Sequence, residues 1–326
     1  EMQQKEIAKL EDYVARNLTR ASTAKSAQSR VKQLEKMERI PKPLRAQKQA
    51  KVRFTYEIDP PVELLKVQDV DISVGSGAER KTLLSSLSFE VRRGEKWGIV
   101  GDNGIGKSTL LRILQGMLPH QGKIRWTSNV KLSYFEQEST NLHPAKTVMQ
   151  EIHDRVPSWT DLEVRSLLGQ VRLTGENVFK PIGVLSGGER AKVCFAVMML
   201  EHGNVLILDE PTAGQDYRHY TEIMEFLKHL NETLGITIIM ITHDMHLMLE
   251  YTDRAIVIAD GELIADDKPA KVLTNEAVAD RAYLKKTSLY DLAVRCGIED
   301  ASGFAERFIY YERQVRADGR QNSDVQ

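Results

Sequence analysis

One stretch of the sequence has the residue types and the spacing that bind phosphate. Residues 101–109 read GDNGIGKST, which fits G-x-x-x-x-G-K-[ST], and they follow the apolar run 97–100 directly. Glycines in such a loop let backbone N–H groups approach phosphate oxygens, Lys107 reaches the β- and γ-phosphates, and Ser108 ligates Mg²⁺. The stretch therefore predicts a phosphate-binding loop (P-loop). The residues expected to contact the nucleotide are Gly101, Asn103, Gly104, Gly106, Lys107, Ser108 and Thr109.

Two carboxylates end a second element. The apolar run 205–208 is followed by Asp209 and Glu210. We expect Asp209 to hold Mg²⁺ through water and Glu210 to polarise an attacking water. Two acids at a strand end are usually only solvated, but a P-loop about a hundred residues upstream favours the catalytic interpretation.

A third motif lies between these two. Ser186, Gly187, Gly188 and Glu189 precede a segment with helical spacing of apolar residues, so the hydroxyl and the glycine amides form another anion site at a helix start. Read alone, it is an ordinary capped helix N-terminus. Two further polar positions follow apolar strands: Gln137, and His243 within Thr242-His243-Asp244.

The order of these motifs resembles that of the ATP-binding cassette (ABC) ATPases, over roughly residues 63–265. The resemblance implies ATP and Mg²⁺ as ligands, with Ser186–Glu189 as the signature. It implies catalytic roles for Glu210, His243 as the switch histidine, and Gln137, which senses Mg²⁺ and the γ-phosphate. The implied metal-binding residues are Ser108, Gln137 and Asp209.

The resemblance also implies that one cassette holds only half of a site. The P-loop of one cassette faces the signature of another, so hydrolysis requires a second cassette, either a second copy or a cassette upstream of Glu1. The family places an aromatic ring against adenine shortly before the second strand, where this sequence has Val74. We therefore expect weaker ATP affinity or a relaxed base preference.

The elements that must position these motifs follow an α/β pattern, because short apolar runs alternate with helical patterns from residue 63 onward. The expected strands lie near 64–74, 87–91, 96–100, 123–126, 131–135, 205–208, 236–241 and 255–258. The resemblance implies a mixed, mainly parallel core sheet, a small antiparallel β part and a compact helical subdomain. We expect three parts: a basic helical hairpin arm (1–56), the cassette (57–267), and a helical tail (268–326) whose end from residue 317 is frayed.

Composition limits the class of protein. The chain has 326 residues, 41% of them apolar, and no continuous apolar run long enough to span a membrane, which excludes a disordered or membrane-spanning chain. The two cysteines suggest neither a disulfide framework nor a zinc site. We expect a soluble, cytoplasmic protein. Because the chain starts with Glu1 and not with methionine, we also expect an upstream part.

Charge divides the chain unevenly. Residues 1–56 hold 14 Lys and Arg against 6 Asp and Glu, a net charge of +8, although the whole chain carries −1. Such a basic arm either meets a polyanion or is a solvated helix. Five arm residues are candidates for contact with RNA, and no DNA partner is expected: Arg20, Lys25, Arg30, Lys32 and Lys36.

Two resemblances divide the chain near residues 200–211. Up to that point it resembles the C-terminal half of an ABC-F protein, in the arm motif of residues 22–38, in YFEQE at 134–138 and in the signature with its continuation RAKV. This class binds the ribosome, and some members protect it from antibiotics. From Pro211-Thr-Ala-Gly-Gln-Asp216 onward the chain resembles the ATPase of energy-coupling factor uptake transporters. The expected role is an ABC-F-like ribosome-associated ATPase; the alternative is the ATPase subunit of an uptake transporter.

Overall fold

The computed structural model describes residues 13, 14, 16, 29–32, 60–75, 81–135, 142–215 and 217–324. Its strands are β1 (Glu63–Val74), β2 (Lys81–Arg92), β3 (Lys96–Gly101), β4 (Gln121–Trp126), β5 (Leu132–Phe135), β6 (Val205–Asp209), β7 (Thr237–Ile241), β8 (Arg254–Ala259) and β9 (Glu262–Asp267). Its helices are α3 (Lys107–Leu114), α4 (Val148–His153), α5 (Asp161–Gln170), α6 (Gly187–Glu201), α7 (Tyr217–Leu234), α8 (Met245–Tyr251), α9 (Pro269–Thr274), α10 (Glu276–Arg281), α11 (Ser288–Arg295) and α12 (Ala301–Asp324), with 3-10 turns η2 (Gly175–Phe179) and η3 (Ile182–Val184).

Two sheets organise the cassette. The larger has the strand order β5-β6-β7-β3-β8-β9, in which β8 and β9 pair antiparallel and the other neighbours pair parallel. The smaller is antiparallel, with the order β2-β1-β4. In the larger sheet Ile241 pairs with both Ile99 and Asp209, so the carboxyl ends of β3, β6 and β7 meet at one edge. This arrangement confirms the predicted mixed α/β fold and brings the segments after these strands together.

The central strands are apolar on both faces because each face is covered. Along β6, Val205 and Ile207 pack with α3 and the small sheet, whereas Leu206 and Leu208 pack with α6 and α7. This alternation follows from the two-residue period of a strand. A fully buried parallel strand therefore reads as one continuous apolar run, as the sequence predicted for residues 205–208.

The helix α3 that follows the P-loop is fixed at its far end by the small sheet. The Trp126 Nε1–H group at the end of β4 donates a hydrogen bond to the Leu114 carbonyl at the end of α3, at 2.8 Å. Leu110, Leu111 and Leu114 of this helix are buried against both sheets. The P-loop helix is thus held along its whole length by apolar packing and at its last turn by a side-chain donor.

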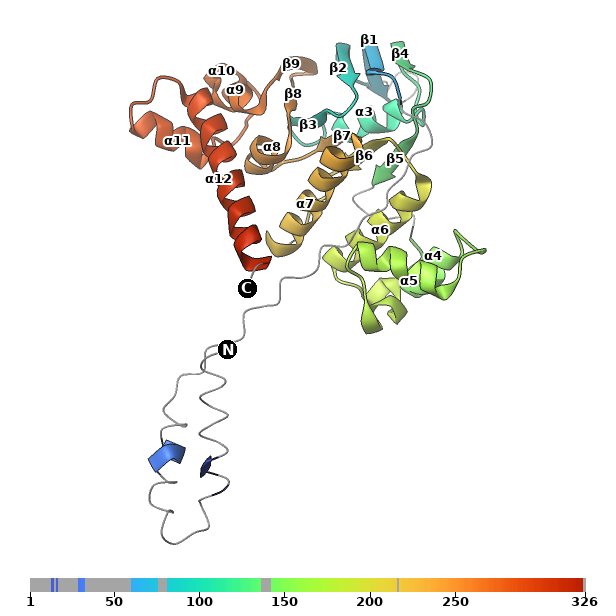
Figure 1. Ribbon diagram of the computed structural model, residues 1–326. Helices are drawn as coiled ribbons and strands as arrows, with labels where there is room; N and C mark the ends of the chain where they lie inside the picture. The colour runs from blue at the N-terminus through green and yellow to red at the C-terminus, as the bar shows by residue number, and fades with distance from the viewer. Residues whose placement is uncertain are drawn as a thin grey trace. The chain divides into compact units, whose positions relative to one another are not determined.

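Two groups of helices pack around the sheets (Figure 1). Helices α4 and α5 pack with α6 through one buried cluster, which confirms the predicted helical subdomain. Helices α9, α11 and α12 pack with α8 and β8 through another, and they form the helical tail. Among the residues the structure describes, every helix is too short or too polar to cross a bilayer.

Three predictions about elements were incomplete or wrong. Strand β9 was not predicted, because ELIADD lacks a sustained apolar run, and its pairing with β8 forms it instead. Strand β2 begins at Lys81, well before the predicted residue 87, because it pairs along β1 up to Val74. Helix α12 continues to Asp324, so the end of the chain is not frayed from residue 317 as predicted.

The chain divides into two compact units, one of residues 1–48 with 323–326 and one of residues 49–322, and the first unit is described only in part. Residues 13, 14, 16 and 29–32 are helical. The Arg30 guanidinium lies over the Tyr13 ring at 3.9 Å from its centroid, a cation–π contact between the two helical pieces. The rest of the predicted helical hairpin lies outside the described residues, so the hairpin stays a prediction. Arg20, Lys25 and Lys36 lie outside the described residues.

Candidate functional site

The P-loop is built from backbone conformations that glycine adopts more readily than any other residue. Gly101 has φ +149°, and a Cβ there would lie 2.2 Å from the carbonyl oxygen of Ile258. Gly106 has φ +110° and precedes the first turn of α3 in the left-handed region. No side chain caps that turn, so its amide donors face the loop. This geometry suits the helix N-terminal anion site that the motif predicts, and phosphate binding there stays a prediction.

Lys107 is almost fully buried at the start of α3. Its Nζ donates hydrogen bonds to the carbonyl oxygens of Gly101 at 2.7 Å and of Asp102 at 2.9 Å. Burial lowers the pKa of the Lys107 ammonium, while the carboxylates of Glu210, Asp102 and Asp209 oppose that shift. The carbonyl oxygens hold the ammonium inside the loop, where phosphate oxygens are the expected competing acceptors.

Ser108 and Asp209, the two predicted metal-binding residues that the structure describes, are in contact. The Ser108 hydroxyl donates to Asp209 Oδ1 at 3.1 Å across the gap between α3 and the end of β6. The Tyr134 hydroxyl reaches the other carboxylate oxygen at 3.5 Å. Burial raises the pKa of the Asp209 carboxyl, and its hydrogen bond from Ser108 opposes the shift. A buried carboxylate beside a hydroxyl is a set of hard oxygen donors that suits Mg²⁺.

Glu210 and His243 are in contact at the same edge of the sheet. Glu210 Oε1 lies 2.8 Å from His243 Nε2, and both side chains are partly exposed. Glu210 has φ +46°, a conformation that non-glycine residues adopt rarely and that often marks functional sites. The segments after β6 and β7 therefore bring the predicted base and the predicted switch histidine together.

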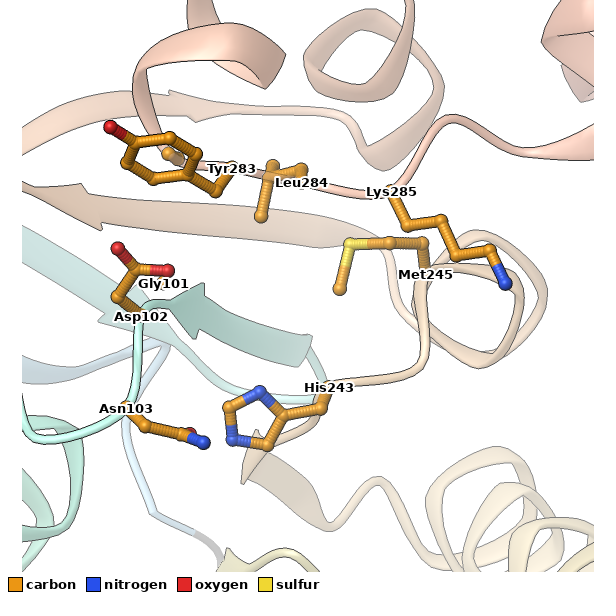
Figure 2. Close-up of a pocket in the computed structure, with 9 residues that line it drawn as sticks. Gly101, Asp102, Asn103, His243, Met245, Tyr283, Leu284 and Lys285 are labelled. Carbon is orange, nitrogen blue, oxygen red and sulfur yellow. The ribbon is translucent and has the colours of Figure 1, made fainter.

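A hollow of about 170 Å³ lies beside the P-loop (Figure 2). Residues 101–103 of the P-loop line one side, and His243 and Met245 line another. Residues 282–285 of the tail complete the rim, with Tyr283 and Lys285 on either side of Leu284. The signature residues are not among those that line this hollow. Within the described part of one chain, the P-loop and the signature therefore belong to separate surfaces.

The signature turn begins α6 and is closed by a reciprocal capping box. The Ser186 hydroxyl accepts from the Glu189 backbone N–H, and the Glu189 carboxylate accepts from the Ser186 backbone N–H at 2.9 Å. These hydrogen bonds lower the pKa of the Glu189 carboxyl, with the backbone donor of Ser186 as the main cause. Gly187 and Gly188 form the first turn of the helix.

The remaining predicted positions are placed as follows. Val74 ends β1 and is 39% exposed. Gly104 has φ +77° and faces open space. Asn103 lines the hollow and Thr109 lies in α3. Gln137 lies outside the described residues, so its predicted role stays a prediction.

Sequence reasoning missed two contributions to the site. Tyr134 belongs to the predicted strand before Gln137. The alternation of side chains along β5 was the available signal for the face on which Tyr134 lies. The tail residues Tyr283 and Lys285 gave no signal, because they follow the P-loop by about 180 positions and only the packing of α9 to α11 brings them near it.

Comparisons with known proteins agree with this geometry. A family model described as "ABC transporter" matches residues 84–213, and a second model with the same description matches residues 1–54. A protein of Enterococcus faecalis named "Putative ABC transporter ATP-binding protein" is 40% identical over 274 residues, which cover 78% of this chain and 47% of that protein. "Putative ATP-binding protein YdiF" of Bacillus subtilis is 41% identical over 264 residues, covering 81% and 40%. The chain thus spans less than half the length of these relatives.

Solved structures share the fold. The cassette MJ0796, in a dimeric post-hydrolysis state bound to ADP and Pi, matches with a TM-score of 0.56 at 23% identity, covering 63% of this chain and 99% of that one. The structure of cbiO1 from Clostridium perfringens, part of the ABC transporter complex cbiONQ, matches with a TM-score of 0.56 at 27% identity, covering 72% and 100%. Together with the family-model match over residues 84–213, these matches show that the chain contains an ABC ATPase cassette, a P-loop NTPase domain.

Proposed function

We propose that the chain binds Mg-ATP at its P-loop and hydrolyses it at an interface with a second cassette. One observation carries this proposal: Ser108 with Asp209, and Glu210 with His243, converge beside the P-loop at the carboxyl ends of β3, β6 and β7. In-line phosphoryl transfer to water needs these groups, namely a metal site, a base and an orienting partner.

Each residue has a distinct part in the proposed reaction. The amides at the start of α3 and Lys107 bind the phosphates, and Ser108 with Asp209 would hold Mg²⁺, which when bound neutralises phosphate charge. Glu210 accepts a proton as the water oxygen forms a bond to the γ-phosphorus. The bond from that phosphorus to the β–γ bridging oxygen breaks, leaving ADP and inorganic phosphate. His243 orients the Glu210 carboxylate through the contact at 2.8 Å.

The second cassette supplies the signature turn. Ser186 and the first amides of α6 form an anion site that is absent from the hollow beside the P-loop of the same chain. A second cassette would bring such a turn to the γ-phosphate. The comparison structures of MJ0796 are described as dimeric, which supports a paired arrangement.

Replacing the proposed base tests the ATPase activity. Glu210→Gln keeps the shape of the side chain and removes the proton acceptor, so the hydrolysis rate should fall about 10²- to 10⁴-fold while ATP binding persists. Steady-state phosphate release measures the rate, and titration with a fluorescent ATP analogue measures binding. Glu232→Gln, on the exposed part of α7, is the matched control and should hydrolyse ATP normally. Undiminished hydrolysis by Glu210→Gln would remove Glu210 from this role.

For the assembly in which the cassette works, we propose the ATP-hydrolysing subunit of an uptake transporter. The first two relatives are named as an ABC transporter ATP-binding protein and an ATP-binding protein. The match to cbiO1 covers all of that chain, and cbiO1 is part of a transporter complex. The resemblance of residues 211 onward to energy-coupling factor ATPases supports the same assignment.

An ABC-F-like ribosome-associated factor is the second candidate, and the arm supports it. Residues 1–56 carry a net charge of +8, and a family model matches residues 1–54 as an extension before the cassette. A basic arm binds RNA through a salt-sensitive electrostatic contribution. This candidate includes protection of the ribosome from antibiotics.

Co-sedimentation distinguishes the two assemblies. Glu210→Gln should prolong the ATP-bound state, so it is mixed with purified ribosomes or with inverted membrane vesicles, with and without ATP, at two salt concentrations. ATP-dependent pelleting with vesicles supports the transporter assignment. Salt-sensitive, ATP-dependent pelleting with ribosomes supports the ABC-F-like role instead.

A further inference from the structure

The signature turn lies against two side chains of the segment that follows Glu210. A Cβ on Gly187 would lie 2.9 Å from Gln215 Nε2, and a Cβ on Gly188 would lie 2.5 Å from His219 Cδ2. Neither glycine has a positive φ. Their backbones would accept a side chain, and it is the neighbouring side chains that leave no room for one.

The contact at Gly188 cannot be relieved by turning the His219 ring alone. The His219 Cβ itself would lie 3.1 Å from a Cβ on Gly188, closer than such atoms normally pack. His219 lies in the first turn of α7, and its side chain is half-buried. The imidazole therefore covers the first turn of the signature helix at close range.

A second contact fixes the two helices in the same register. Lys192 Nζ lies 2.9 Å from Glu222 Oε2, and both side chains are mostly buried. Lys192 follows Gly188 by four residues on α6, and Glu222 follows His219 by three on α7, so each pair shares one helix face. The N-terminal ends of α6 and α7 thus dock along a strip, with His219 against the signature turn.

The position of this turn bears on the proposed reaction. A preorganised phosphate site holds its donors within about 0.5 Å of the productive geometry through neighbouring contacts. The capping box between Ser186 and Glu189 fixes the turn internally. It does not fix the direction in which the turn faces across the interface, which depends on what the turn packs against.

We propose that His219 is a positioning residue for the signature turn. Its imidazole packs on Gly188 and holds the first-turn amides of α6 in the orientation that meets a γ-phosphate bound to the other cassette. The inference rests on the proposed function, because the turn needs an ATP-bound partner to act on. It also explains the glycine at position 188, because the His219 side chain occupies the volume that a Cβ at this position would need.

ATP-dependent dimerisation of the Glu210→Gln protein, measured by analytical ultracentrifugation, tests the inference. His219→Ala should raise the ATP concentration for half-maximal dimer about tenfold, and Gly188→Ala should abolish the dimer. Gly188→Ala combined with His219→Ala should regain dimer, because the new methyl group occupies space that the imidazole has left. His229→Ala, on the exposed face of the same helix, is the control and should match the parent.

Two results in this assay would overturn the inference. One is an unchanged ATP requirement in His219→Ala. The other is failure of Gly188→Ala to regain the dimer even when it is combined with His219→Gly, which would mean that Gly188 is needed for contact with phosphate and not for contact with His219. His219→Gly in the double variant removes the remaining Cβ contact, so it should restore the dimer at least as well as alanine does.

Hydrogen exchange in the absence of ATP tests the same inference without a dimer. A peptide covering residues 183–192 should exchange several-fold faster in His219→Ala than in the parent or in His229→Ala. If the parent forms no dimer with ATP, the proposed function fails, and the exchange rates still decide whether His219 holds the turn. Unchanged exchange would overturn the inference by itself.

Discussion

The P-loop and the signature turn are both helix N-termini at which we propose that backbone amides bind phosphate, yet their glycines are required for different reasons. In the P-loop, Gly101 and Gly106 adopt positive φ angles. In the signature turn, Gly187 and Gly188 have ordinary backbone angles, and Gln215 and His219 fill the space beside them. The first requirement is local to the chain, whereas the second arises between two helices.

The carboxylates of the two regions differ as well. Burial raises the pKa of Asp209 beside the P-loop, so the ionised carboxylate destabilises the folded protein until a cation binds. Hydrogen bonds from Ser186 lower the pKa of Glu189 in the signature turn, so its charge stabilises the fold. The P-loop region is thus arranged for a ligand, and the signature turn is largely satisfied within its own chain.

Alanine at Gly101 should have the largest effect, and it tests whether the P-loop glycines are required by the backbone. Gly101→Ala combines an unfavourable φ with a Cβ 2.2 Å from the Ile258 carbonyl, so it should lower the free energy of unfolding by about 3 kcal/mol. Gly104→Ala, where φ is +77° but nothing lies within 4 Å, should cost only about 1–2 kcal/mol. Urea denaturation measures both; equal losses would contradict the role of the carbonyl.

Removing the P-loop ammonium should strongly weaken ATP binding without loss of the fold. Lys107→Ala removes the buried ammonium of the P-loop, and ATP affinity should fall about 100-fold or more, equivalent to about 2.7 kcal/mol. Isothermal titration calorimetry measures the affinity. Lys228→Ala on α7 should bind ATP as the parent does. Unchanged affinity in Lys107→Ala would contradict the P-loop assignment.

Neutralising Asp209 should stabilise the protein in the absence of Mg²⁺. The pKa of Asp209 is raised in the folded state, so the folded protein loses stability as the pH rises from about 4 through that pKa. Asp209→Asn avoids this loss and should melt at a higher temperature at pH 8, with a difference that shrinks toward pH 4. Thermal melts in EDTA measure this; a lower melting temperature at pH 8 would contradict it. Stabilisation by Mg-ATP should be lost in the same variant.

The smallest effect is expected for the signature cap. Ser186→Ala removes the hydroxyl that accepts from the Glu189 N–H, and it should lower stability at pH 7 by about 1 kcal/mol. The pKa of Glu189 is lowered in the folded state, so the stability linked to that carboxylate is present at neutral pH and is lost as the pH falls below about 4. Thr160→Ala removes the equivalent cap of α5 and should cost the same without changing ATP-dependent dimerisation.

The difference between the two regions also explains what could be predicted from the sequence. The P-loop, the Asp209–Glu210 pair and the central strands were predictable because each depends on a short contiguous pattern. The juxtaposition of Glu210 with His243 followed from parallel strands ending at one edge. The contact of His219 with Gly188 depends on the docking of two helices, and no local pattern encodes it.

Strand β9 is an intermediate case. Its sequence lacks apolar alternation, but Asp260 and Gly261 between β8 and β9 both have positive φ, as in a two-residue hairpin turn. The dipeptide Asp-Gly was an available signal for this hairpin. The start of β2 at Lys81 had no comparable signal, because it depends on pairing with β1.

The hydrogen bond from Trp126 to the last turn of α3 places a fluorescent indole at the end of the P-loop helix. Indole emission depends on the surroundings of its N–H group, so separation of the Leu114 carbonyl from Trp126 on unfolding would change the emission of this tryptophan. Trp97 lies fully buried in β3 and Trp159 lies with the helical subdomain, so each tryptophan belongs to a different element. Trp126 is therefore an intrinsic fluorescent reporter of the contact between the P-loop helix and the small sheet.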